Sequence, residues 1–445
     1  MVLLSMMVNN LVQRLSADIE KLTLGHELAI LSVAIPLIFA AIIFFIVVWS
    51  YVDPYKKARK ELPTQNRLNP LVTLFVAVRN DELAIVDCVE SMLNQTYVNR
   101  EIFVVDDASD DETSNVLKQR FGDNPEINII YLKKNVGKKR ALAKAIKVSK
   151  GEIFAFTDSD SIWKEDAIER IVAIFENEPE VGAISGHCNA KNANSNLLTR
   201  MQDTWYEKQY RLRKGFESVF RSVSCVSGPL ACYRRSAIYN YIPRWTNDKF
   251  LGKEFRFATD RVMTGFVLCG SELGPKIKNE YSHSSFVKDE DYPNKDWDVV
   301  YCNSAKSWTI VPETMNKIIS QKIRWNKSFI RNLFFTGKLY WKKPLPTALY
   351  YYLQIIFVFV YPLLITTLVV LLLLNDYFLL LAVCFMGYAV LSAIMTSVLA
   401  PENKKIYEPV AGILLYHLLF QWLIFYSIAT IRNMNWSRTK PKEVQ

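Results

Sequence analysis

No charged residue occurs between Leu28 and Val52, near the start of a chain of 445 residues. An apolar run of this length spans the ~30 Å hydrocarbon core of a bilayer as a tilted helix. It is too long for the core of a cleavable signal peptide, and no small-residue cleavage site follows it. We therefore predict a retained transmembrane helix at 28–52, and hence an integral membrane protein.

The remainder divides into a soluble-looking centre, residues 54–345, and three further apolar segments at 345–374, 377–400 and 410–431. Basic residues collect on the cytoplasmic side of a membrane, and four of them follow the first apolar run directly: Lys56, Lys57, Arg59 and Lys60. We therefore expect a multi-pass protein of the plasma membrane whose central domain is cytoplasmic.

The last apolar segment, 410–431, would begin and end on the same face of the membrane. Pro409, Gly412, His417 and Gln421 weaken it as a helix that faces lipid. We expect it to be re-entrant or interfacial, or to be a span packed against protein.

The net charge of +10 does not require a nucleic-acid partner, because juxtamembrane lysines that meet anionic lipid and phosphate-binding residues account for it. The seven cysteines are scattered and form no CxxC pair. We therefore expect neither a zinc site nor a disulfide framework.

Short apolar runs alternate with helical segments in the first half of the central domain. Strands are predicted at 71–78, 101–107, 127–132 and 152–161, with a helix after each of the first three and Ser109 as the N-cap of the second helix. This alternation predicts a doubly wound α/β domain with a mostly parallel sheet. Ligands of such sheets bind beyond the carboxyl ends of the strands.

Acidic residues stand at those strand ends. Asp106 and Asp107 end the second strand, and Asp158 and Asp160 end the fourth. Asp107 or Asp110 alone is equally well explained as a helix cap. Two acids one residue apart can share a divalent cation with a diphosphate. Because no GxGxxG follows the first strand and no GxxxxGK[ST] occurs, dinucleotide and P-loop chemistry lose their main support. We favour a metal–nucleotide site at Asp158 and Asp160.

A set of motifs then points to a family. In chain order they are "VAVRNDE", "VVDDASDDET", "NVGKKRALAKA", "FTDSDS", "VSGPLACYRR", "TDR" and "QKIRW". The set resembles that of the family-2 processive glycosyltransferases with a GT-A fold, within which the chain is most similar to hyaluronan synthases. The resemblance runs from about residue 70 to 340 and resumes in "ATIRNMNWSRTK". Chitin and Nod-factor synthases and some mixed-linkage polymer synthases share the set, so the polymer stays open.

The resemblance implies a Rossmann-like GT-A domain fused to an α-helical transmembrane channel. The implied domains are an N-terminal segment 1–53, a cytoplasmic glycosyltransferase domain 54–316, interface helices 317–344, C-terminal transmembrane or re-entrant helices 345–431, and a cytoplasmic tail 432–445.

The resemblance places the nucleotide-sugar at the strand ends. Asp106 or Asp107 would hold the uridine, and Asp158 and Asp160 would bind Mg²⁺ or Mn²⁺ on the diphosphate. Lys138 and Arg140 would add positive charge near the nucleotide, although they are equally well explained as solvated charges at a helix start.

The catalytic base is implied by "FATDRVMTG". Asp260 matches the last acid of a TED or GDD motif, which takes a proton from the acceptor hydroxyl as that hydroxyl attacks the anomeric carbon. Thr259 stands where the family has an acid, so Asp260 is the one carboxylate available there. The alternative interpretation is a plain ion pair between Asp260 and Arg261.

The QxxRW motif implies the acceptor site. Arg324 would neutralise charge on the leaving diphosphate, Trp325 would stack beneath the terminal acceptor sugar, and Gln321 would form a hydrogen bond nearby. Ser227 and Gly228 of "VSGPLACYRR" are assigned to the same acceptor site. Interfacial anchoring alone is the alternative explanation of the Arg and Trp.

Two stretches depart from the family. Trp436 and Arg438 in "WSRT" resemble a WGTR gating loop that closes over the nucleotide, but one residue is missing between Trp and Arg, and an ordinary basic juxtamembrane tail is the alternative. Residues 270–299 are longer and more acidic than expected, and we interpret them as a surface insertion.

The resemblance implies a processive, inverting β-glycosyltransferase that extrudes its own polysaccharide across the membrane. A hyaluronan synthase would use UDP-GlcNAc and UDP-GlcA alternately, whereas a chitin-type synthase would use UDP-GlcNAc. A non-processive lipid glycosyltransferase, which usually lacks "QKIRW", and an inactive scaffold are the alternatives. Further partners are the growing chain and membrane lipids, and no obligatory protein partner is evident.

Overall fold

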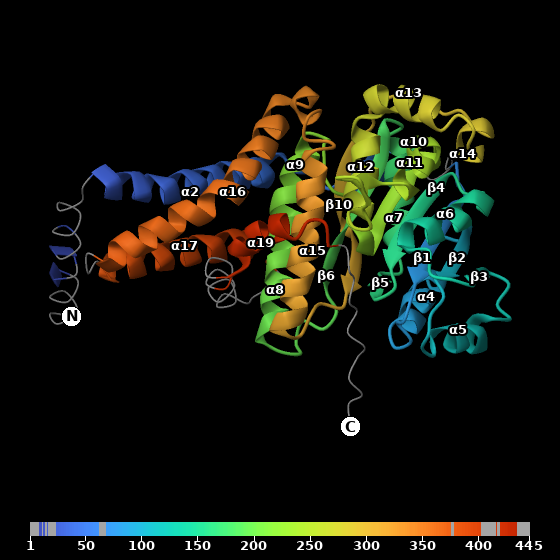
Figure 1. The fold of residues 1–445 in the computed structure, drawn as a ribbon, viewed down its shortest axis with the longest axis horizontal. Coiled ribbons are helices and arrows are strands. Elements are labelled where there is room, and N and C mark those ends of the chain that lie inside the picture. The colour runs from blue at the N-terminus through green and yellow to red at the C-terminus, as the bar shows by residue number, and fades with distance from the viewer. Residues whose placement is uncertain are drawn as a thin grey trace.

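The computed structural model describes residues 24–61, 68–374, 378–401 and 419–433, together with residues 9, 10, 12, 13, 16 and 415. Trp436 and Arg438, the residues of the expected gating loop, lie outside the described residues, as do Pro409, Gly412 and His417. An α/β domain occupies one end of the molecule, and apolar helices extend away from it (Figure 1).

Within the described residues, the α/β domain is built on an eight-stranded sheet with the order β3-β2-β1-β4-β7-β6-β10-β5. Strands β1 to β4 are parallel, β7 is antiparallel to both its neighbours, β10 runs parallel to β6, and β5 is antiparallel to β10. The prediction of a mostly parallel α/β sheet is therefore confirmed. The strands are β1 (Val72–Val78), β2 (Arg100–Asp106), β3 (Ile127–Tyr131), β4 (Ile153–Asp158), β5 (Ser161–Trp163), β6 (Val181–Ala190), β7 (Ala231–Arg234) and β10 (Asp298–Thr309), with a separate hairpin of β8 (Lys249–Phe250) and β9 (Lys253–Glu254).

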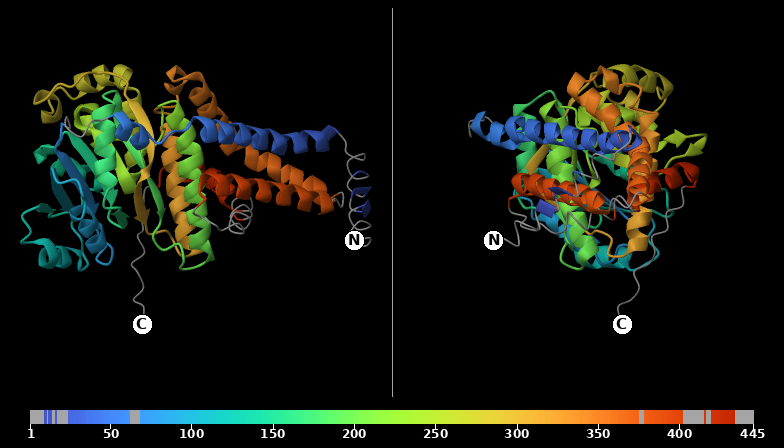
Figure 2. Two further views of the ribbon diagram at one scale, coloured as in Figure 1. Left: turned by 180° about the vertical axis from the view of Figure 1, so that it is seen from behind. Right: turned by 90° about the vertical axis from the view of Figure 1, so that its left-hand side faces the viewer.

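Helices cover both faces of the sheet (Figures 1 and 2). On β1, Phe75 packs into one buried cluster while Leu74 and Val76 pack into the other. This burial on both faces explains why the strand is a continuous apolar run and not an alternating one. The helices of this half are α4 (Ile85–Leu93), α5 (Thr113–Phe121), α6 (Lys138–Val148) and α7 (Ala167–Asn177).

The second half of the domain carries the shorter helices and the two long ones nearest the apolar helices. Helix α8 (Leu197–Glu207) continues through a π-helix, η1 (Lys208–Lys214), into α9 (Gly215–Val219), and α15 (Met315–Leu333) lies beside it (Figure 1). The others are η2 (Gly228–Leu230), α10 (Arg235–Ile238), η3 (Tyr239–Tyr241), α11 (Ile242–Thr246), α12 (Thr259–Leu268), α13 (Gly270–Glu280), α14 (Ser285–Lys288) and η4 (Tyr340–Lys342).

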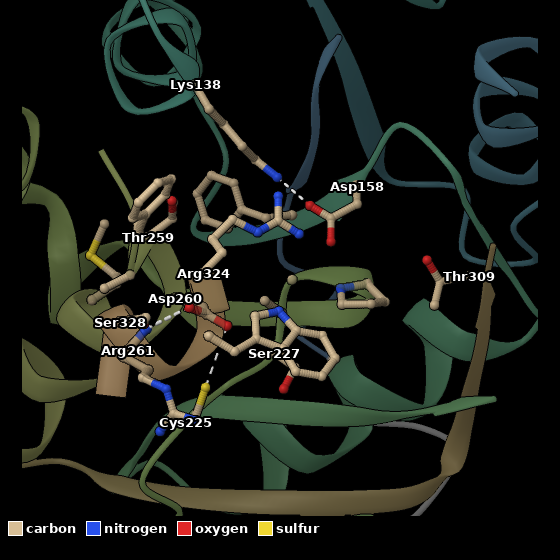
Figure 3. Close-up of a pocket in the computed structure, with 18 of the residues that line it drawn as sticks. Lys138, Asp158, Cys225, Ser227, Thr259, Asp260, Arg261, Thr309, Arg324 and Ser328 are labelled. Atoms are coloured by element: carbon tan, nitrogen blue, oxygen red, sulfur yellow. Dashed lines mark hydrogen bonds and ion pairs between the residues drawn. The ribbon is translucent and has the colours of Figure 1, made fainter. Parts of the chain in front are cut away.

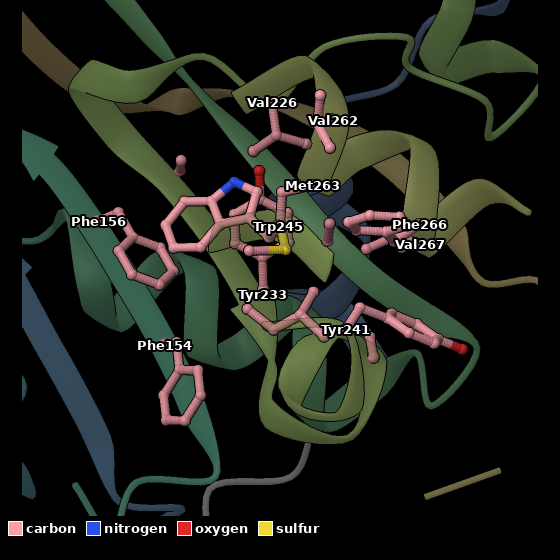
Figure 4. Packing of buried hydrophobic residues seen from close by; sticks show 14 of the residues in the cluster. Phe154, Phe156, Val226, Tyr233, Tyr241, Trp245, Val262, Met263, Phe266 and Val267 are labelled. Carbon is pink, nitrogen blue, oxygen red and sulfur yellow. The ribbon is translucent and has the colours of Figure 1, made fainter. Parts of the chain in front are cut away.

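Helix α12 is fixed by a dense apolar cluster. Val262, Met263 and Phe266 pack toward Tyr233 and Trp245 (Figure 4). The indole N–H of Trp245 also donates to the carbonyl oxygen of Thr259 at 2.9 Å. The first turn of α12, which bears Asp260, is therefore held from two sides.

The stretch 270–299 lies mostly at the surface, as expected, but it is anchored to the domain through a few apolar residues. Ile277 and Trp297 are buried, and Leu273 and Phe286 pack against the same cluster that fixes α12. Its acidic residues form ion pairs with neighbouring basic residues, for example Glu290 with Arg235. The acidic residues therefore pair with neighbouring basic residues in a segment that packs on the domain, and they do not belong to a free loop.

The apolar helices α2 (Leu24–Ser50), α16 (Leu345–Leu374) and α17 (Phe378–Leu399) extend from the domain and contact one another (Figures 1 and 2). Two helical stretches in the described chain, Leu37–Lys60 and Leu345–Leu371, are long and apolar enough to cross a membrane. Of the last apolar segment, the described part forms η5 (Phe420–Trp422) and α19 (Leu423–Ala429), and α19 packs along α15.

The first apolar helix is tied firmly to the sheet. At its end, the Tyr51 hydroxyl donates to the carbonyl oxygen of Tyr301 at 2.9 Å, and the buried Asp53 accepts from the Ser304 N–H at 2.7 Å. A Cβ added at Gly215 of α9 would lie 3.3 Å from Val47, so the two helices approach closely there. The short basic helix α3 (Pro54–Glu61) then packs on α7.

Candidate active site

A cavity of about 350 Å³ opens between the ends of the central strands, α12 and α15. Residues predicted from separate motifs meet in it, as Figure 3 shows for several of them. The predicted residues that line the cavity are Lys138, Asp158, Asp160, Ser227, Gly228, Asp260, Gln321, Arg324 and Trp325.

The two acids of the DxD motif stand at one end of the cavity. The Lys138 ammonium pairs with the Asp158 carboxylate, and in Figure 3 the Arg324 side chain extends toward the same carboxylate. Asp160 accepts a hydrogen bond from the Thr309 hydroxyl at 3.2 Å. Both acids therefore present oxygen atoms to one space beyond the end of β4.

Gly228 lies against Asp158 so closely that another residue would not fit. A Cβ added at Gly228 would lie 2.6 Å from Asp158 Oδ2. The glycine thus lets the "VSGPLACYRR" loop contact the carboxylate with its backbone.

Asp107 does not line the cavity but shapes the turn beside it. Its two carboxylate oxygens accept from the backbone N–H groups of Val136 at 2.7 Å and Gly137 at 2.8 Å. Burial raises the pKa of Asp107. Gly137 has a φ of 88°, which a glycine adopts freely, and α6 begins with the next residue, Lys138. Asp107 therefore supports the turn that presents Lys138 to Asp158.

Asp106 is also engaged within the fold and does not line the cavity. It accepts hydrogen bonds from the Ser109 N–H at 3.0 Å, from the Ser109 hydroxyl at 2.6 Å and from the Ser114 hydroxyl. The prediction of Ser109 as a helix N-cap is wrong, because α5 begins at Thr113 and the Ser109 hydroxyl serves Asp106 instead.

Arg140 lies away from the cavity. It forms an ion pair with Glu254 at 3.1 Å, and both side chains are more than one-third exposed. Its interpretation as a solvated charge therefore fits the structure better than its interpretation as a nucleotide contact.

Asp260 stands in the first turn of α12. Its Oδ1 accepts from the backbone N–H of Arg261 at 2.9 Å, and its Oδ2 accepts from the Cys225 thiol at 3.4 Å. The Arg261 guanidinium instead lies 6.0 Å from the centre of the Phe329 ring, so these two described residues form no side-chain ion pair. The carboxylate faces the cavity and is partly exposed.

The residue before this turn has an unusual backbone. Ala258 adopts a left-handed conformation, with φ 61° and ψ 34°, although it is buried and is not a glycine. Such a conformation costs an L-residue roughly 1–2 kcal/mol. The strain lies two residues from Asp260 and sets the direction in which α12 begins.

Lys214 lines the cavity although the sequence analysis did not select it. Its ammonium donates to the hydroxyls of Ser185 at 2.8 Å and Ser227 at 2.7 Å, and burial lowers its pKa to about 8. In the sequence it is one of several basic residues in "KQYRLRK", which suggests a solvated helix face. The π-helix that turns it inward has no evident sequence signal.

An aromatic wall forms another side of the cavity. The Trp325 ring stacks on the Trp205 ring, with 5.6 Å between centres and 15° between planes, and Tyr206 and Tyr210 line the cavity beside them. The sequence analysis missed the residues contributed by α8 and η1. A signal was present, because Trp205, Gln209 and Arg213 recur every four residues and all three line the cavity.

Comparisons with known proteins agree with this geometry. Residues 73–242 match the family described as glycosyl transferase family 2. The chain is 29% identical over 371 residues to a hyaluronan synthase of Streptococcus pyogenes, covering 81% of each chain. It is also 29% identical over 275 residues to an N-acetylglucosaminyltransferase of Rhizobium meliloti (strain 1021), covering 61% of this chain and 58% of that relative.

Among solved structures, the mannosyltransferase PcManGT of Pyrobaculum calidifontis, in complex with GDP-Man and Mn²⁺, superposes with a TM-score of 0.53 and 17% sequence identity. The match covers 92% of this chain and 99% of that one, and at this identity it bears on the fold alone. Residues 73–242 therefore match a family 2 glycosyltransferase domain, the fold is of the GT-A type, and the chain is a glycosyltransferase similar to hyaluronan synthases.

Proposed function

We propose that the chain is a membrane-embedded, processive and inverting β-glycosyltransferase that makes hyaluronan from UDP-GlcNAc and UDP-GlcA. The observation that carries this proposal is the single cavity in which the DxD acids, Asp260 and the QxxRW helix meet, beside helices apolar enough to cross a membrane. The 29% identity to a hyaluronan synthase over most of both chains supports the choice of polymer.

The donor end of the cavity fits a divalent cation. Asp158 and Asp160 both offer carboxylate oxygens there, which Mg²⁺ and Mn²⁺ prefer. No cluster of three or more His, Cys, Asp or Glu residues was found in the described part of the chain, so further ligands would come from the diphosphate and water. Bound there, the cation would neutralise the diphosphate of the UDP-sugar. Lys138 would add its charge to the same group.

The uridine contact expected of Asp106 or Asp107 requires a change of partners, because both carboxylates are engaged by the fold. We propose that Asp107, the one whose partners are backbone N–H groups next to Lys138, exchanges one of them when the nucleotide binds. Arg140 is left out of the proposed nucleotide site because it pairs with Glu254 away from the cavity.

Asp260 is the proposed general base. It would take the proton of the acceptor hydroxyl as that oxygen attacks the anomeric carbon and the UDP departs on the opposite side. Arg324 would stabilise the charge that grows on the departing diphosphate, and such preorganised charge is most effective where water is scarce. The carboxylate is free for this task because its contacts to Arg261 and Cys225 leave an oxygen face toward the cavity.

The acceptor end is proposed to consist of Trp325, Gln321 and the Ser227–Gly228 turn, which line the cavity together. Lys214 connects this turn to β6, because its ammonium donates hydrogen bonds to both Ser185 and Ser227. The growing chain would leave past α15 toward the helices α2, α16 and α17, which we propose as walls of the channel in a multi-pass protein of the plasma membrane with a cytoplasmic catalytic domain.

The gating loop is proposed for the tail that bears Trp436 and Arg438. The carbonyl oxygen of Asn433 accepts a hydrogen bond from Lys327 of α15 at 2.7 Å, so the last described residue lies beside the catalytic helix. The tail therefore starts beside the helix that bears Gln321, Arg324 and Trp325.

A chitin-type synthase that uses UDP-GlcNAc alone is the second candidate. The N-acetylglucosaminyltransferase of Rhizobium meliloti matches the chain with the same 29% identity over a shorter stretch, which favours this alternative over a lipid glycosyltransferase or a scaffold.

The variant Asp260→Asn tests the proposed chemistry. In full-length protein in nanodiscs with Mn²⁺, UDP release should fall by at least about 100-fold, the size of a lost general base, while UDP binding should stay within about twofold. Asp123→Asn, at an exposed loop position, is the matched control and should keep full activity. Unchanged turnover in Asp260→Asn would refute Asp260 as the base, and a wild-type protein that releases no UDP would favour the scaffold.

A further inference from the structure

Lys322 of the QxxRW helix contacts the rings of two tryptophans. The Lys322 ammonium is 3.4 Å from the centre of the Trp205 ring and 4.7 Å from the centre of the Trp325 ring. The two rings are nearly parallel, with 5.6 Å between their centres, so the ammonium contacts both members of one stacked pair. The helices that carry these residues, α8 and α15, lie side by side where the domain meets the apolar helices (Figures 1 and 2).

Within the described part of the chain, the Lys322 ammonium has no anionic partner. Among the described residues it forms no hydrogen bond and no ion pair, and its recorded interactions are with the two indole rings. Burial lowers the pKa of Lys322 to about 7. A cation held away from water without an acceptor is costly, and contacts with aromatic rings offset only part of that cost.

Among the described residues, the preceding one, Gln321, has an unpaired hydrogen-bond acceptor. Gln321 lines the cavity, and its side-chain oxygen is buried without any hydrogen-bond donor among the described residues. Within the described chain, an unpaired acceptor that lines the cavity and an unpaired cation therefore occupy successive positions of α15, and the cation contacts two indole rings that line the same cavity.

These groups match one class of ligand. Indole rings pack well against the C–H faces of pyranose rings, an amide oxygen accepts from a sugar hydroxyl, and an ammonium pairs with a carboxylate. A neutral sugar would use the first two and leave the cation unpaired.

We propose that Trp205, Gln321 and Lys322 form, with Trp325, a subsite for a uronic acid unit of the acceptor chain. This inference rests on the proposed polymerase function, which already implies an acidic acceptor, and adds to it two residues, Trp205 and Lys322, that hold the uronic acid unit.

The test compares binding of two short oligosaccharides to the full-length protein in nanodiscs. One contains alternating uronic acid and N-acetylhexosamine units, and the other is the same molecule with its carboxyl groups reduced to alcohols. In the wild type, reduction should weaken binding about tenfold, the usual size of a charged hydrogen bond. In Lys322→Met, both oligosaccharides should bind as weakly as the reduced one does to the wild type. Lys322→Arg should restore the preference.

Lys317→Met is the matched control, because Lys317 is an exposed lysine on the same helix, and it should keep the wild-type preference. Equal binding of the two oligosaccharides by the wild type would overturn the proposal without any variant. A full tenfold preference retained in Lys322→Met would also overturn it, because the carboxylate would then bind elsewhere.

The outcome is separable from the proposed function. Polymer synthesis by the wild type without a carboxylate preference would refute the subsite and leave the polymerase standing. A carboxylate preference that depends on Lys322, in a protein that makes no polymer, would refute the polymerase and leave an acidic-sugar site.

Discussion

At the scale of single residues, Ala258 offers a clear test of how Asp260, the proposed base, is positioned. Its left-handed backbone, φ 61°, is strained for alanine and free of strain for glycine. Ala258→Gly should therefore raise stability by about 0.5–1 kcal/mol after the entropy of the unfolded chain is counted. The measurement is the midpoint of heat-induced inactivation in detergent. Ala173→Gly, inside α7, should lower that midpoint instead. A lower midpoint for Ala258→Gly would contradict the assigned conformation.

Gly228 tests the donor end of the cavity. In Gly228→Ala the new methyl group would collide with Asp158 Oδ2, 2.6 Å away, and displace that carboxylate. Misplacing a metal-binding oxygen costs roughly tenfold in metal affinity. Activity titrated with Mn²⁺ should therefore half-saturate at about tenfold higher concentration, with thermal stability little changed. An unaltered Mn²⁺ titration would show that Asp158 does not hold the cation.

The sequence predicted the residues that line the cavity better than it predicted the residues that hold the surrounding loops in place. The acids at 158 and 160, Asp260 and the QxxRW residues all line it. The first two stand at a strand end that is visible in the sequence, and the others belong to motifs of the resembled family. Asp106 and Asp107 were expected there and instead serve neighbouring loops, which depends on contacts with residues up to about 30 positions away. Lys214 was missed because the π-helix that turns it inward leaves no mark on composition.

At the scale of elements, one buried carboxylate joins the nucleotide side of the site to the QxxRW helix. Asp248 pairs with Lys139 of α6 at 3.0 Å and with Arg331 of α15, and all three side chains are almost completely buried. Asp248→Asn would leave two buried cations without their anion, a loss of about 3–5 kcal/mol. The heat-inactivation midpoint should fall clearly.

The matched control for Asp248 is Glu280→Gln. Glu280 pairs with Arg244 at 3.1 Å on the surface, where both side chains are more than one-third exposed, so its removal should cost less than about 1 kcal/mol. Equal effects of the two variants would mean that Asp248 does not couple α6 to α15.

The contact between β6 and β10 gives a prediction for pH. His187 is fully buried, bonds to the Tyr301 hydroxyl at 2.6 Å and has a pKa that burial lowers to about 4. An unfolded histidine takes up a proton near pH 6.5, so its contribution to stability is complete above that pH and is lost as pH falls toward 4. The inactivation midpoint should fall over this window in the wild type and fall less in His187→Gln. An equal slope in both proteins would assign the acid sensitivity to other groups.

The boundaries of helices and strands were predictable where an apolar run is bounded by turn residues. The expected strands and the helix at 138–149 agree with the observed ones within about one residue, because apolar runs and turn residues mark both ends, except that β4 ends at Asp158, three residues earlier than expected. The later strands β6, β7 and β10 were not predicted. Their order in the sheet depends on pairing between residues 46 or more positions apart, which no local pattern records.

At the scale of the whole molecule, the orientation of the catalytic domain can be measured directly. The described cysteines are buried, apart from the half-buried Cys225. The Lys276 side chain is 72% exposed on α13, so Lys276→Cys adds an accessible thiol. A membrane-impermeant thiol reagent should label this variant from the cytoplasmic face and not from the outside of intact cells. Labelling from outside would contradict the basic residues of α3 as a marker of the cytoplasmic side.

The central claim is that one polypeptide joins two UDP-sugars into a polymer. The most direct measurement supplies purified protein in nanodiscs, with Mn²⁺, with UDP-GlcNAc alone, with UDP-GlcA alone, and with both, and follows UDP release and labelled high-mass product. We predict a polymer only when both sugars are present, and its degradation by hyaluronidase. A polymer made from UDP-GlcNAc alone and degraded by chitinase would contradict the account and assign the same cavity to a chitin-type synthase.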